Sequence, residues 1–145
     1  LKKIKKYTEE KNQTENIIFL DFVEDKYLPY LYLNSLALAM PTFSGPTNIP
    51  PWEAFKIGVP VLYSDIHNIK EVYKDAVYYI DPLDPETMVK GIKNIIEDNS
   101  LKNKLIEKGK KLLSSTNVNK EFERFFTIIK KRKKIKQTWE FNNKS

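Results

Sequence analysis

The chain has 145 residues, a length that fits one domain whose core removes roughly two thirds of the unfolded surface from water. Its 41% apolar and 30% charged residues are typical of a globular protein. With no cysteine and a single histidine, His67, the sequence excludes disulfides, thiolate zinc sites, cysteine nucleophiles and multi-histidine metal sites within it. No apolar run in it reaches the roughly 18–20 residues that a membrane span needs.

The net charge of +6 is unevenly distributed. Residues 1–100 carry 11 basic and 15 acidic residues, whereas residues 101–145 carry 14 basic and 4 acidic ones. An interaction with a polyanion would therefore involve the tail alone, and the basic run 130–136 could contact anionic lipid. Only Arg124 and Arg132 are arginine, the residue whose planar fork nucleic-acid surfaces favour, so we expect no nucleic-acid partner.

Short apolar runs alternate with helical patterns along the chain. Unbroken apolar segments, two of them rich in β-branched and aromatic residues, predict strands at residues 17–20, 36–40, 59–63 and 77–80. Helical periodicity predicts helices within residues 1–15, 27–34, 51–57, 65–73, 85–96, 101–112 and 122–129. We expect one folded domain over residues 1–115 and a basic helical tail over residues 116–145.

Proline and capping residues indicate where several of these helices begin. Pro51 suits the first position of its helix, and Pro50 predicts an extended Ile49 before it. Asp84 and Ser100 are the predicted caps of two later helices. Strands that alternate with helices predict an α/β fold with a Rossmann-like parallel sheet flanked by helices. Such folds bind ligands beyond the carboxyl ends of their strands, so the loops there are candidate sites.

The loop and helix start over residues 44–55 combine features that suit a bound anion. A helix N-terminus offers backbone N–H groups and the positive end of the helix dipole, and Gly45 lets the backbone approach a ligand closely. Thr47 and Asn48 supply short polar side chains, and the two oxygens of Glu53 suit a vicinal diol such as that of ribose. The same residues are ordinary turn formers, so spacing alone leaves both interpretations open.

The run from Gly45 to Phe55, Gly-Pro-Thr-Asn-Ile-Pro-Pro-Trp-Glu-Ala-Phe, resembles the donor-site signature of group 1 (family 4) glycosyltransferases. Flanking segments resemble the same family in the same order, over residues 15–113. The resemblance implies the GT-B fold, in which two Rossmann-like domains face a cleft and the nucleotide-sugar donor binds mainly the C-terminal one. The chain resembles most of that C-terminal domain, truncated at its N-terminal side.

The resemblance also implies roles for particular residues. Glu53 corresponds to the glutamate that holds the donor ribose, and the backbone after Gly45 would meet the diphosphate and the sugar. The implied donor-binding residues are Gly45, Pro46, Thr47, Asn48, Ile49 and Glu53. Gly45 stands where the family pattern has its first glutamate, a variant that a subset of the family shares. Phe22 and Val23 lie where the family's loop borders the nucleobase.

The implied activity is a retaining transfer of a sugar that needs neither a metal ion nor a cofactor. A sugar, lipid-linked or protein acceptor would be held by an N-terminal domain that precedes this segment and supplies the catalytic residues. We therefore expect a fragment of a longer enzyme that is cytoplasmic or peripheral to a membrane, and an inactive isolated chain. In the strand order 3-2-1-4-5-6, the predicted strands would be numbers three to six, so residues 17–20 would lack their neighbour.

Two other functions stay open at this point. A non-catalytic nucleotide-sugar-binding module is favoured by the glycine at position 45, because the family's carboxylate is absent there. A nucleic-acid-binding protein would use the basic tail, but the sequence contains no RNA-binding motif to support it.

Overall fold

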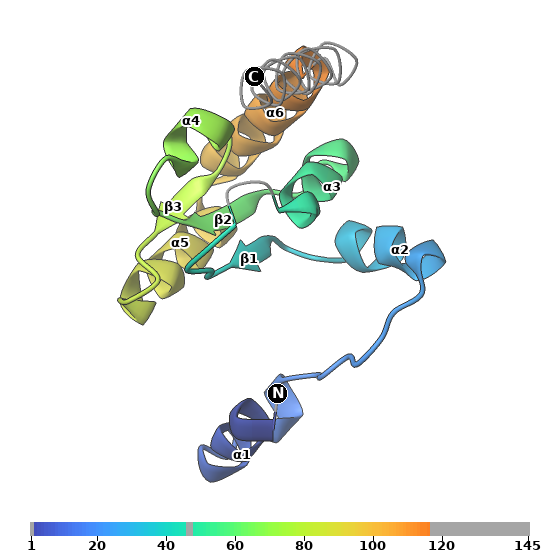
Figure 1. The fold of residues 1–145 in the computed structure, drawn as a ribbon, viewed down its shortest axis with the longest axis vertical. Coiled ribbons are helices and arrows are strands. Elements are labelled where there is room, and N and C mark those ends of the chain that lie inside the picture. The colour runs from blue at the N-terminus through green and yellow to red at the C-terminus, as the bar shows by residue number, and fades with distance from the viewer. Residues whose placement is uncertain (1, 46–47, 117–145) are drawn as a thin grey trace, which may run out of the picture.

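The computed structural model describes residues 2–45 and 48–116, which contain a three-stranded parallel sheet with helices on both faces (Figure 1). The strands are β1 (Leu38–Met40), β2 (Val61–Ser64) and β3 (Tyr78–Ile80). They lie in the order β1-β2-β3, with Leu38 opposite Val61 and Leu62 opposite Tyr78. The predicted fold class and three of the four predicted strands are confirmed.

The helices from residue 49 onward pack around the sheet, whereas the first two helices precede it along the chain. The described helices are α1 (Lys2–Glu10), α2 (Leu28–Leu33), α3 (Ile49–Ile57), α4 (Ile69–Tyr73), α5 (Pro85–Glu97) and α6 (Asn99–Ser115), with 3-10 turns at Thr14–Asn16 and Asp25–Tyr27. None of these helices is long and apolar enough to cross a bilayer. The predicted helix over residues 122–129 and the tail beyond Thr116 lie outside the described residues.

The starts of two helices test the capping predictions. Asp84 caps α5 as predicted, because its carboxylate accepts a hydrogen bond from the Glu86 N–H at 3.0 Å. The cap of α6 is Asp98, two residues before the predicted Ser100, and it accepts from the Leu101 N–H at 2.9 Å. A carboxylate at this position satisfies a free N–H and also favours the positive end of the helix.

The start of α3 differs from the prediction. The helix begins at Ile49, so Pro50 and Pro51 occupy its second and third positions. The extended residue before the helix is Asn48, with φ −62° and ψ 136°, and not Ile49. Gly58 ends the helix in the left-handed conformation, with φ 90°, which glycine adopts without strain.

Side chains alternate along β2 and divide the core into two layers. Val61 and Tyr63 pack with α3 and α4 on one face, whereas Leu62 packs with β3, α5 and α6 on the other. All four residues of β2 are buried, as expected for a parallel strand covered on both faces. At Gly109 a Cβ would overlap the ring of Phe55, so this glycine lets α6 pack directly against α3.

The predicted strand at residues 17–20 is wrong. These residues have no regular structure, and Ile18 is 84% exposed. Phe22, which follows the segment, is also 84% exposed. A β-strand needs a neighbour for its backbone hydrogen bonds, and no segment among the described residues pairs with this one. Figure 1 shows that the chain here runs as an extended connection between α1 and α2.

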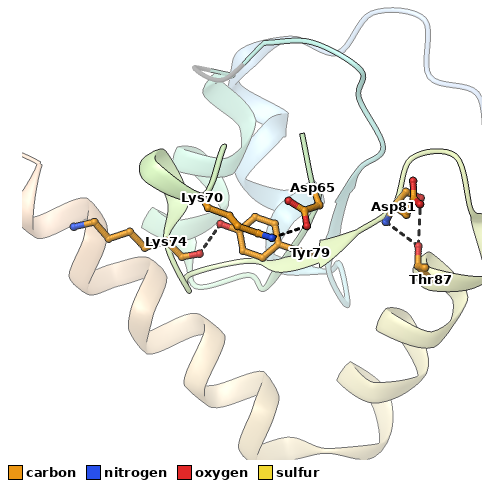
Figure 2. A network of polar contacts seen from close by, with 6 residues as sticks. All are labelled: Asp65, Lys70, Lys74, Tyr79, Asp81 and Thr87. Carbon is orange, nitrogen blue, oxygen red and sulfur yellow. Dashed lines mark hydrogen bonds and ion pairs between the residues drawn. The ribbon is translucent and has the colours of Figure 1, made fainter. Parts of the chain in front are cut away.

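Lys74, which follows α4, has a backbone conformation that favours glycine. Its φ of 51° and ψ of −117° lie outside the regions that side-chain-bearing residues populate. The hydroxyl of Tyr79 donates a hydrogen bond to the Lys74 carbonyl at 2.5 Å and holds this turn from β3 (Figure 2). Nearby, the Lys70 ammonium pairs with Asp65 at 2.6 Å and lies over the Tyr79 ring. Such strain persists only where surrounding contacts enforce it.

We predict that Lys74→Gly raises the free energy of unfolding by about 1 kcal/mol, because glycine removes the strain at this φ but adds entropy to the unfolded chain. Chemical denaturation measures the change. The matched control is Lys90→Gly within α5, which should lower the free energy of unfolding by about 0.5–1 kcal/mol. Equal destabilisation by both variants would contradict the prediction.

Candidate functional site

Two buried tyrosines hold the ends of the loop that follows β1. The hydroxyl of Tyr63 donates a hydrogen bond to the Gly45 carbonyl at 2.7 Å and accepts one from Asn48 Nδ2 at 2.7 Å. The hydroxyl of Tyr73 donates to the Asn48 carbonyl at 3.2 Å. Both tyrosines are 0% exposed, so the core itself determines where the loop begins and ends. Burial raises the pKa of each phenol above its ordinary value, which keeps both hydroxyls protonated.

Two features of the structure favour glycine at position 45. Its φ of 94° is a left-handed conformation that side-chain-bearing residues rarely adopt. A Cβ there would also lie 2.6 Å from Asn48 Oδ1, a distance that requires the Asn48 side chain to shift. The backbone conformation and this close contact therefore disfavour a glutamate at position 45.

Glu53 faces a different surface of α3. Its Oε2 accepts a hydrogen bond of 2.9 Å from the hydroxyl of Tyr32 on α2. Both residues line a cavity of about 560 Å³ between α2 and α3, together with Asp25, Leu28, Pro29, Lys56 and Ile57. A volume of this size is within the range of small-molecule sites, and the lining combines apolar surface with one cation and two carboxylates.

Tyr32 and Glu53 influence each other. Burial, the hydrogen bond to Glu53 and the charge of Glu53 together raise the pKa of Tyr32 to about 12. The phenol therefore remains a proton donor at any physiological pH and orients the carboxylate. Because the bond uses Oε2, the Oε1 atom stays suited to accept from the hydroxyl of a ligand.

The position of Glu53 in its helix corrects one part of the sequence interpretation. Because α3 begins at Ile49, Glu53 is its fifth residue and lies in the second turn and not the first. The helix dipole therefore contributes less to Glu53 than it would to a residue of the first turn, since that effect falls off within the first turn. Pro50 and Pro51 also lack N–H groups, so Ile49 alone of the first three positions can donate to an anion.

The structure brings only some of the predicted site residues together. Gly45 and Asn48 are in contact, and Ile49 beside them is 67% exposed. Pro46 and Thr47 lie outside the described residues. Phe22 and Val23 do not line the cavity of Glu53, because its lining begins at Asp25. The roles of these residues stay predictions.

Sequence reasoning assigned no role to four residues of this region. Tyr32 and Lys56 line the cavity, while Tyr63 and Tyr73 hold the loop. For Tyr32 the sequence offers a signal, because residues four apart lie on one helix face and Tyr32 follows Leu28, another residue of the cavity, at that spacing. For the other tyrosines no local signal exists, since their partners lie 15 to 25 residues away.

A parallel sheet covered by helices on both faces, with a polar loop after the carboxyl end of a strand, defines the class of Rossmann-like α/β domains. Residues 1–112 match the family model of the glycosyl transferases group 1. The chain therefore belongs to this family of glycosyltransferases.

Curated relatives agree with that assignment. Over 84 residues the chain is 34% identical to the O-antigen chain mannosyltransferase B of Escherichia coli, and these residues make up 58% of this chain and 22% of that protein. Over 81 residues it is 35% identical to the O-antigen chain mannosyltransferase RfbU of Salmonella typhimurium, and these residues make up 56% of this chain and 23% of that protein. An uncharacterized glycosyltransferase, MJ1607 of Methanocaldococcus jannaschii, is 26% identical over 97 residues, 66% of this chain and 25% of that protein. The chain spans about a quarter of the length of these relatives.

Among solved structures, the sucrose-phosphate synthase of Thermosynechococcus elongatus shares the fold, with a TM-score of 0.76 at 17% identity. The similarity covers 90% of this chain and 33% of the synthase. At this identity the comparison supports the architecture only.

We predict that Tyr63→Phe lowers the free energy of unfolding by about 1–2 kcal/mol, because the Gly45 carbonyl and the Asn48 amide lose a buried partner. Chemical denaturation measures the change. Tyr30→Phe is the matched control, since Tyr30 is 65% exposed and should leave stability unchanged. An unchanged stability of Tyr63→Phe would show that the hydroxyl does not hold the loop.

Alkaline pH tests two half-buried phenols. The pKa of Tyr32 and of Tyr79 is raised from 10.0 to about 12. Below about pH 10 the folded and unfolded chains both keep these protons, so stability is unaffected. Between about pH 10 and 12 the unfolded chain releases protons that the folded chain retains, and the free energy of unfolding falls as pH rises. Denaturation curves at about pH 8, 10 and 11 measure the slope, and a flat profile would contradict the prediction.

Proposed function

We propose that this chain binds the nucleoside-diphosphate sugar in a glycosyltransferase that transfers the sugar to a glycan acceptor. Membership of the family supports glycosyl transfer as the reaction class. The observation that carries the proposal is the carboxylate of Glu53, oriented by the Tyr32 hydroxyl and facing the cavity between α2 and α3.

In this proposal Glu53 binds the ribose of the donor. A carboxylate with one oxygen held by Tyr32 can accept a hydrogen bond from a ribose hydroxyl with the other, and such a charge-assisted bond contributes about 1.5–3 kcal/mol. The apolar side chains of Leu28 and Ile57 line the same cavity and suit the flat face of a nucleobase.

The diphosphate and the sugar bind the loop after β1. Gly45, Pro46, Thr47, Asn48 and Ile49 make up the proposed contact segment. Since Pro50 and Pro51 lack N–H groups, backbone amides of the loop supply the hydrogen bonds, and the dipole of α3 adds a favourable field for the leaving diphosphate. Tyr63 and Tyr73 hold the two described ends of the loop, at Gly45 and Asn48, before the donor arrives, which lowers the cost of ordering these two residues on binding.

The reaction itself is proposed as a transfer with retention of configuration that uses no metal ion or cofactor. The bond between the sugar and the diphosphate breaks, and the acceptor's hydroxyl oxygen bonds to the same carbon as its proton leaves. The names of two relatives point to mannose as the sugar and a polysaccharide as the acceptor. A part of the protein beyond this chain would hold the acceptor, and the enzyme would work in the cytoplasm or at a membrane surface.

A non-catalytic nucleotide-sugar-binding module is the second candidate. Gly45 favours it, because the loop geometry disfavours a carboxylate at the position where the family pattern has one. Sugar transfer by the complete protein that contains this sequence decides between the two, since only the enzyme turns over its donor.

We predict that Glu53→Ala weakens donor binding at least about tenfold, because the ribose loses a charge-assisted hydrogen bond. Calorimetry of the complete protein with GDP-mannose and UDP-glucose measures the affinity. The control is Glu86→Ala, which removes an acidic side chain at the start of α5 and should leave the affinity unchanged. Donor binding by Glu53→Ala that equals the native affinity would refute the assignment of the ribose site.

A further inference from the structure

A second cavity lies between α4 and α6, separate from the one beside Glu53. Its volume is about 410 Å³. The lining residues are Tyr73, Lys74, Asp75, Ala76, Lys108, Lys111, Leu112 and Ser115. None of them lines the cavity of Glu53, so a ligand here would not compete directly for that space.

The charge of this cavity is strongly positive. Among the described residues that line it, three are lysines, Lys74, Lys108 and Lys111, and one is acidic, Asp75. That carboxylate is already paired, because Lys108 Nζ donates a hydrogen bond to Asp75 Oδ2. The hydrogen bond from Lys108, together with the charges of Lys108 and Lys104, lowers the pKa of Asp75, so the carboxylate stays ionised beside Lys108. Two positive charges are therefore left for a ligand.

The spacing of these lysines places them on one surface. Lys104, Lys108 and Lys111 are separated by four and three residues along α6, so they occupy one face of the helix. Lys74 approaches the same face from the turn after α4, and Figure 2 shows its side chain extending toward α6. The lysine charges repel one another, and an anion bound among them would offset this repulsion.

The backbone of Lys74 provides an independent observation. Its positive φ of 51° would be free of strain with glycine, whereas a lysine in this conformation is strained. The side chain at this position thus adds a positive charge to the cavity at the expense of stability. Strain of this kind gathers at functional sites more often than elsewhere.

We propose that the cavity between α4 and α6 is a binding site for a phosphate monoester group, held by Lys74, Lys108 and Lys111. A phosphate monoester carries a charge of about −1.5 to −2 near neutral pH, which matches the two uncompensated positive charges. The cavity is larger than the phosphate alone, so it also accommodates part of the molecule that bears the group. The site is distinct from the donor site and does not depend on the proposed function.

The experiment titrates the complete protein with inorganic phosphate and then with glycerol 3-phosphate, and follows the backbone amide resonances of α6 and of residues 44–49 separately. Saturating binding should shift the resonances around Lys111 and Ser115. Glu53→Ala, which affects the donor site, should leave these shifts unchanged. That comparison separates failure of this proposal from failure of the proposed donor site.

Two variants test the lysines. Lys74→Gly and Lys111→Gln should each weaken phosphate binding at α6 about fivefold, as expected for loss of one partly exposed charge. Lys74→Gly removes strain, so a weaker affinity in this variant does not reflect unfolding. The control is Lys90→Gln on α5, which changes the net charge equally and should leave the affinity unchanged. Equal weakening by all three variants would indicate a general charge effect and overturn the site.

The source of the phosphate group is tested by a second measurement. Vesicles of phosphatidylcholine with and without phosphatidic acid are sedimented with the protein and with the Lys74→Gly and Lys111→Gln variants. Binding that needs both phosphatidic acid and these lysines identifies a lipid headgroup, whereas a response to glycerol 3-phosphate alone identifies a soluble phosphomonoester. No lysine-dependent response to either probe overturns the proposal.

Discussion

The hydroxyl of Tyr63 joins the core of the sheet to the loop on which the proposed donor site depends. Tyr63 belongs to the central strand and is fully buried, and its ring packs against Tyr73 with centroids 4.9 Å apart. Its hydroxyl contacts both described ends of the loop, at Gly45 and Asn48. Because the interior is close-packed, the loop cannot move at these points without disturbing the sheet. The protein thus presents a loop whose anchor points are set by folding and not by the ligand.

Tyrosine hydroxyls hold the proposed site at two places, the loop before α3 and the Glu53 side chain on α3. On one side, tyrosines from the core hold the loop before Ile49; on the other, Tyr32 holds Glu53. Tyr32 also approaches the Pro50 carbonyl at 3.5 Å, so it contacts the start of the helix as well as the carboxylate. Glycine at position 45 belongs to the same arrangement, since the left-handed turn and the nearby Asn48 disfavour a side chain there. Glycine at this position is therefore consistent with the backbone conformation and with the contacts of Asn48.

Tyr73 contacts both the proposed donor loop and the basic cavity beside α6. Its hydroxyl bonds to the Asn48 carbonyl beside the proposed donor loop, and its side chain lines the basic cavity against α6. The basic cavity owes its charge to residues from separate elements: Lys74 after α4 and Lys108 and Lys111 on α6. The packing of α6 against α3 at Gly109 brings those elements together, because no side chain at that position keeps the helices apart.

The sequence by itself determined the class of fold, the family and most local structure. The strands at β1, β2 and β3, the cap at Asp84 and the helix end at Gly58 follow from apolar runs and from residues whose conformational preferences act within a few positions. Tertiary structure alone decided that residues 17–20 form no strand, since strand formation requires a neighbour. It also decided the contacts of Tyr32, Tyr63 and Tyr73, whose partners lie 15 to 25 residues away. Such contacts depend on how helices and strands pack, and for Tyr63 and Tyr73 no local pattern in the chain encodes them.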